Sequence, residues 1–140
     1  MSSTQSTDPI VVSAARWFWW IAGFSLVNTV LFFSGTQTNF MLGLGMTTLA
    51  NAVFAKQLAV ALIVAGMAAA FFLVIGLQAQ RERVWAFYLG LAVYVLDAFI
   101  FVTYEDWFPV VIHAVAIFYI SKGLVQLRER SAEEPAAAQA

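Results

Sequence analysis

The chain has 140 residues, of which 62% are hydrophobic and only 11% are charged, whereas soluble domains carry about 25% charged residues. So few charges cannot cover a water-soluble surface, and the composition therefore indicates an integral membrane protein. The net charge of −1 provides no basic surface for nucleic acid. The absence of cysteine and the single histidine exclude thiolate metal sites, iron–sulfur clusters and multi-histidine metal sites within one subunit, so we expect no metal and no cofactor.

The N-terminal segment, residues 1–13, begins with a polar stretch that has no helical periodicity, and we expect a disordered tail there. The first apolar span follows at 14–34. It opens with Arg16 and a block of aromatic side chains, a combination typical of the membrane–water boundary. A secretory signal peptide is the alternative. The length of the apolar run and the lack of a small-residue cleavage site after it favour a membrane span.

The next segment, residues 40–55, has two different faces. Its apolar positions and its small or polar positions recur at helical spacing, which favours a short helix in the outer membrane interface or a re-entrant segment. A fifth membrane span is the alternative. The apolar positions are Leu42, Met46, Leu49 and Val53, and the small or polar ones are Gly43, Thr47, Thr48 and Asn51.

Three further spans complete the predicted membrane domain, at 57–77, 85–104 and 109–127. Each has about 20 residues, enough to cross a hydrocarbon core of about 30 Å. The last residues, 128–140, are charged and then Ala-rich, and we expect a second disordered tail. The predicted fold is therefore all-α: a polytopic membrane protein with a four-transmembrane-helix bundle, 14–127, plus a short interfacial or re-entrant helix.

The basic residues predict the orientation of the spans. With both termini in the cytoplasm, six of the seven Lys and Arg residues fall on or near the inner side, and only Lys56 lies outside. A fifth crossing would move Arg81 and Arg83 to the outer side, against the positive-inside rule. We therefore expect a multi-pass protein of a bacterial-type inner (plasma) membrane, with both termini cytoplasmic.

Three polar residues inside the predicted spans share a depth. At 1.5 Å per residue, Asn28, Asp97 and His113 lie about 9, 10 and 6 Å below the outer ends of their helices. The third and fourth spans are joined by a few residues, so they are antiparallel neighbours. Asp97 and His113 are therefore expected to pair across this hairpin, because an unpaired carboxylate at that depth costs about 2.5–3.5 kcal/mol.

The expected ligand or proton site consists of Asp97 and His113, lined by Asn28 and Tyr94. Glu105 and Asp106 form an acidic outer mouth in the turn between the third and fourth spans. The structural alternative is that these polar groups only hold the helices together. In that case Glu105 and Asp106 are solvated turn residues.

Three functions remain open from the sequence, which contains no recognisable catalytic signature. The first is binding or translocation of a small solute, ion or proton at the Asp97–His113 pair. The second is a non-catalytic structural or accessory subunit of a larger membrane complex. The third is a lipid-modifying enzyme with His113 as base. The expected partners are the bilayer and, through the small residues of 57–77, a second copy or a larger complex.

Overall fold

The structure is a computed structural model, which describes residues 7–35 and 44–138. The described chain is all-helical, and four of its helices are long and apolar enough to cross a membrane. This agrees with the all-α class and the four long apolar helices that were expected, and it indicates a multi-pass membrane protein. The five helices are α1 (Pro9–Phe33), α2 (Gly45–Val53), α3 (Leu58–Gln80), α4 (Val84–Thr103) and α5 (Trp107–Ala138).

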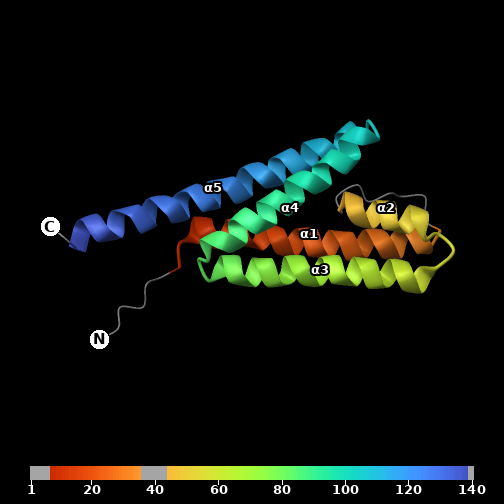
Figure 1. Cartoon of the computed structure of the whole chain (residues 1–140), viewed down its shortest axis with the longest axis horizontal. Coiled ribbons are helices and arrows are strands. Elements are labelled where there is room, and N and C mark those ends of the chain that lie inside the picture. Colours follow the sequence, from red (N-terminus) through yellow and green to blue (C-terminus); the bar gives the residue numbers. More distant parts are fainter. Residues whose placement is uncertain (1–6, 36–43, 139–140) are drawn as a thin grey trace.

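The four long helices pack around a small aromatic core. Helix α1 lies beside α3 and α5, and α4 packs against both of those helices (Figure 1). The fully buried Phe18 of α1 stacks on Phe72 of α3 and tilts against Phe87 of α4. Apolar helices in lipid associate through such close packing, because lipid chains are as apolar as the side chains themselves.

Helix α2 lies in a wedge between the long helices. The α4–α5 hairpin diverges from α1 and α3 toward its turn, and α2 occupies the space that opens there (Figure 1). The N–H of Leu44 donates to Ser25 Oγ at 3.1 Å, and Ser25 lies eight residues, or about 12 Å, before the end of α1. The start of α2 therefore lies beside Ser25 of α1, and α2 leads from there toward α3. Residues 40–43 of the predicted segment lie outside the described residues.

The first and the last helix are both longer than expected. Helix α1 begins at Pro9 rather than at residue 14, because the Asp8 side chain accepts from the N–H of Ile10 at 2.8 Å and caps the helix. The same hydrogen bond holds the pKa of Asp8 below its ordinary value. Helix α5 continues to Ala138, through a segment rich in the strong helix formers Arg, Glu and Ala.

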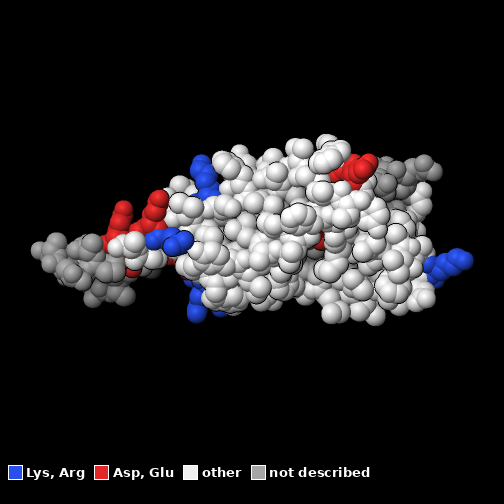
Figure 2. Space-filling view, turned by 45° about the horizontal axis from the view of Figure 1, so that its top comes forward, with Lys and Arg blue, Asp and Glu red and all other residues white. Residues whose placement is uncertain are grey.

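An ion cluster joins three parts of the chain at this end. Arg130 of α5 lies 2.9 Å from Glu82 Oε1 in the α3–α4 turn. The N–H of Asp8 donates to the same oxygen at 3.2 Å, and Gln126 Nε2 donates to Asp8 Oδ2 at 3.1 Å. Figure 2 shows charged side chains gathered at the end from which α5 projects, followed by a broad uncharged surface on that face of the molecule.

Candidate functional site

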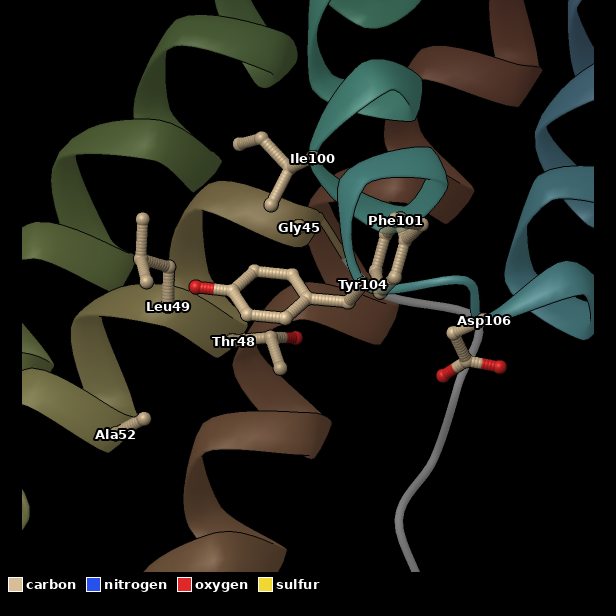
Figure 3. Close-up of a pocket in the computed structure, with 8 residues that line it drawn as sticks. All are labelled: Gly45, Thr48, Leu49, Ala52, Ile100, Phe101, Tyr104 and Asp106. Carbon is tan, nitrogen blue, oxygen red and sulfur yellow. The ribbon is translucent and has the colours of Figure 1, made fainter.

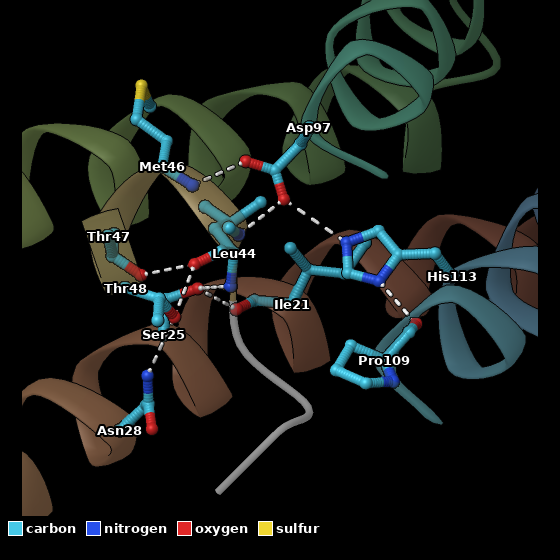
Figure 4. Close-up of polar contacts among 11 residues, drawn as sticks. Ile21, Ser25, Asn28, Leu44, Met46, Thr47, Thr48, Asp97, Pro109 and His113 are labelled. Atoms are coloured by element: carbon cyan, nitrogen blue, oxygen red, sulfur yellow. Dashed lines mark hydrogen bonds and ion pairs between the residues drawn. The ribbon is translucent and has the colours of Figure 1, made fainter. Parts of the chain in front are cut away.

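Asp97 of α4 is the centre of a buried polar cluster (Figure 4). Its Oδ2 accepts from the N–H of Gly45 at 2.6 Å and its Oδ1 from the N–H of Met46 at 2.8 Å. Its Oδ2 also lies 3.1 Å from His113 Nε2 of α5. Asp97 is only 5% exposed and His113 is fully buried. The contact expected between these two residues is therefore present, and the start of α2 joins it.

Asp97 acts as an N-terminal cap for a helix to which it does not belong. The first N–H groups of a helix lack partners within it, and Leu44, the residue at the N-cap of α2, provides no side-chain hydrogen bond. The Asp97 carboxylate supplies the acceptors instead. A negative charge at a helix N-terminus is also stabilised by the helix dipole, by about 0.3–1 kcal/mol and up to ~2 kcal/mol when partly buried.

A glycine at position 45 allows this contact. A Cβ at Gly45 would lie 3.0 Å from the backbone oxygen of Asp97, from Ile100 Cβ and from the Phe101 ring. The start of α2 therefore packs directly on the α4 backbone. Any side chain there would push the two amides away from the carboxylate.

His113 is held through both ring nitrogens and is packed against two aromatic rings. Its Nδ1 lies 2.9 Å from the carbonyl oxygen of Pro109. Its ring stacks on Tyr94 with centroids 4.3 Å apart and an angle of 14°, and Phe101 tilts against it at 5.2 Å. In this orientation Nε2 points toward Asp97.

The hydrogen-bond geometry of the two side chains leaves two arrangements of their protons. A carbonyl oxygen can only accept, so Nδ1 of His113 carries a hydrogen and donates it to Pro109. The contact between Nε2 and Asp97 Oδ2 then needs a second hydrogen, on either atom. The pair is therefore imidazolium with carboxylate, or imidazole with carboxylic acid. In either arrangement both oxygens of Asp97 accept from a backbone N–H group.

Asn28 does not line the pair as expected. Its Nδ2 donates to Thr48 Oγ1 of α2 at 3.2 Å, and Thr29 Oγ1 accepts from Asn51 Nδ2 of α2 at 3.2 Å. The polar face of α1 therefore packs against α2, which the sequence analysis did not place beside it. Tyr94 lies where expected, against the imidazole.

The two acidic residues of the α4–α5 turn lie apart from the pair. Glu105 is exposed and has a positive φ of 55°. Asp106 borders a pocket of about 240 Å³ between α2 and α4, over which the Tyr104 ring extends toward α2 (Figure 3). Gly45 and Phe101 also line this pocket. Because both contact the Asp97–His113 pair, they separate the pocket from it.

The role of α2 is the part of the site that sequence reasoning missed. The amides of Gly45 and Met46 have no side-chain signature, so no residue pattern identifies them as partners of Asp97. One signal was available. Leucine at the N-cap of α2 cannot accept a hydrogen bond with its side chain, so the first N–H groups of α2 need acceptors from elsewhere. A buried carboxylate, in turn, needs donors. Comparisons of the chain with protein-family models, with curated proteins and with solved structures find no match.

Proposed function

We propose that this is a small multi-pass protein of a bacterial-type inner membrane that binds or passes a proton at the Asp97–His113 pair. The observation that supports the proposal is the contact of two buried ionisable side chains beside the start of a short helix, with Asp97 Oδ2 3.1 Å from His113 Nε2. Ionisable groups within membrane-spanning helices mark proton and ion pathways more often than chance.

Both proton states of the pair have a stabilising partner. With the proton present, imidazolium and carboxylate neutralise each other. With the proton absent, the remaining carboxylate still accepts from the N–H groups of Gly45 and Met46. A site that exchanges a proton requires this balance, because a charge without partners in the bundle would be too costly to form.

The pocket between α2 and α4 lies next to the pair and is the proposed route to it. Gly45 and Phe101 form its inner wall, and Asp106 lies at its rim. A carboxylate at the rim raises the local concentration of cations, including hydronium. A movement of the Phe101 ring would open the pocket to Asp97, so Phe101 is the gate in this proposal.

Proton flux in proteoliposomes tests the function. We expect the wild-type protein to dissipate an imposed pH gradient, measured with a trapped pH-sensitive dye, and Asp97→Asn to reduce the rate at least tenfold because an amide cannot exchange the proton. Glu129→Gln is the matched control, since Glu129 is exposed near the end of α5. Equal rates for Asp97→Asn and wild type, or no flux above empty vesicles, would contradict the proposal.

A structural subunit is the second candidate, favoured by the complete set of partners on Asp97. An asparagine at 97 has one acceptor oxygen, so the N–H of Gly45 or of Met46 loses its partner, at about 1–3 kcal/mol. Under this candidate Asp97→Asn lowers stability and leaves flux unchanged. Because His113 is the only histidine, ¹⁵N-histidine NMR of the wild type reports this pair alone. A titrating Nε2 favours the proton site, and an invariant one favours the structural role.

A further inference from the structure

A second pocket, of about 210 Å³, lies between α1, α4 and α5. Its α1 wall consists of three aromatic residues spaced three and four positions apart, which places them on one face of the helix. Two of them, Trp20 and Phe24, stack with centroids 5.6 Å apart. The α1 residues are Trp17, Trp20 and Phe24; α4 contributes Tyr94; and α5 contributes Ile112, Val115 and Ala116, with Ile21 of α1 completing the wall.

The polar groups of this wall are hydrogen-bond donors. The lining residues that carry such donors are Tyr94, with its hydroxyl, and Trp17 and Trp20, with their indole N–H groups, and the rest of the lining is apolar. Tyr94 is 1% exposed as a whole residue and is one of the residues that line the pocket. The wall is therefore complementary to a molecule that brings an acceptor.

The pocket opens toward lipid rather than toward water. Trp20 is 60% exposed and Val115 is 42% exposed, and both lie well inside helices that can cross a membrane. A ligand reaches such an opening from the hydrocarbon of the bilayer. Aromatic side chains favour a flat ring, which stacks on them or meets them edge to face.

We infer that this pocket binds the ring of a lipid-soluble quinone, with the Tyr94 hydroxyl donating to a ring carbonyl. A quinone combines the required properties: a flat apolar ring, acceptor oxygens and solubility in the bilayer. The stack of Tyr94 on His113 holds the phenol ring in place. An acyl chain also fits the apolar wall, but at this depth it offers no acceptor. The inference does not depend on proton exchange by the neighbouring pair.

Tryptophan quenching by menadione, 2-methyl-1,4-naphthoquinone, tests the inference on the full chain in detergent micelles. We expect saturable quenching, because two of the five tryptophans line the pocket. The competitor 2-methylnaphthalene has the same ring system without the carbonyls. It should displace menadione about five- to tenfold less effectively than an unsubstituted naphthoquinone does, the difference that one hydrogen bond makes.

Two substitutions assign the binding to this pocket. Tyr94→Phe keeps the ring and its stack but removes the hydroxyl, and should weaken menadione binding about five- to tenfold. Its matched control is Tyr104→Phe at the exposed outer end of α4, which should bind as the wild type does. Val115→Trp fills the pocket from its lipid-facing side and should abolish saturable quenching.

Three outcomes would overturn the inference. If quenching does not saturate, menadione only partitions into the micelle. If 2-methylnaphthalene competes as well as the quinone, the pocket is an apolar groove for acyl chains. If Tyr94→Phe binds menadione as tightly as Tyr104→Phe does, the hydroxyl makes no contact with the ligand. None of these results bears on proton flux through Asp97, so the two proposals can fail separately.

Discussion

Gly45 determines how closely α2 approaches α4. Gly45→Ala would bring a methyl group within 3.0 Å of the α4 backbone and the Phe101 ring, so we expect a loss of about 1–3 kcal/mol in the free energy of unfolding. Reversible unfolding in mixed micelles measures it. Gly66→Ala is the control, because a Cβ at that position meets nothing within 4 Å. That substitution should stabilise the helix by about 0.5–1 kcal/mol. A Gly45→Ala protein as stable as the wild type would show that α2 can shift without cost.

At the residue scale, the positions of the ionisable residues in the sequence predicted that Asp97 and His113 meet, but they did not predict which other residues contact them. Asp97 and His113 are ionisable residues in consecutive helices joined by a short turn, so depth and connectivity sufficed to bring them together. Asn28 has the same depth but a different neighbour, Thr48. The depth of a residue along a helix does not specify the direction in which its side chain points. The partner of Asn28 lies in α2, and the sequence did not predict where α2 packs in the bundle.

Among the elements, α2 depends most on contacts with other helices. Ser25 Oγ donates to Ile21 O in its own helix and accepts from the N–H of Leu44. Ser25→Ala leaves that buried N–H without a partner, so we expect about 1–3 kcal/mol less protection of the first α2 amides. Hydrogen exchange of residues 44–47 in micelles measures it.

Ser131→Ala is the matched control for this exchange experiment. Ser131 Oγ likewise donates to the carbonyl four residues earlier, Leu127 O, but it lies in α5 at the opposite end of the bundle from α2. It should leave exchange of the α2 amides unchanged. Similar exchange in Ser25→Ala and in the wild type would mean that Asp97 alone holds the start of α2.

Helix existence was predictable and helix ends were not. Runs of about 20 apolar residues identify the spans almost by length alone. The start of α1 at Pro9 depends on one capping hydrogen bond from Asp8, and the end of α5 depends on helix propensity in a charged segment. A single cap and the helix propensity of a few residues are weak signals compared with a run of about 20 apolar residues. The polar composition of residues 1–13 and 128–140 therefore predicted disordered tails instead.

For the whole molecule, the lack of cysteine makes topology directly testable. Four spans place the α3–α4 turn and the α2–α3 connection at opposite ends of α3. In intact cells, a membrane-impermeant maleimide should label Lys56→Cys, whereas Arg81→Cys should react only after the membrane is permeabilised. Ala69→Cys, buried in the middle of α3, should stay unlabelled in both conditions. Labelling of positions 56 and 81 from the same side would contradict the orientation.

The two ends of the bundle differ in the contacts that hold their helices together. At one end, the contacts of Arg130, Glu82 and Asp8 join α5 and the start of α1 to the α3–α4 turn. At the other, the α4–α5 hairpin stands away from its neighbours with α2 as a prop (Figure 1). The hydrogen bonds from the N–H groups of Gly45 and Met46 to Asp97 therefore join the diverging part of the hairpin to α2.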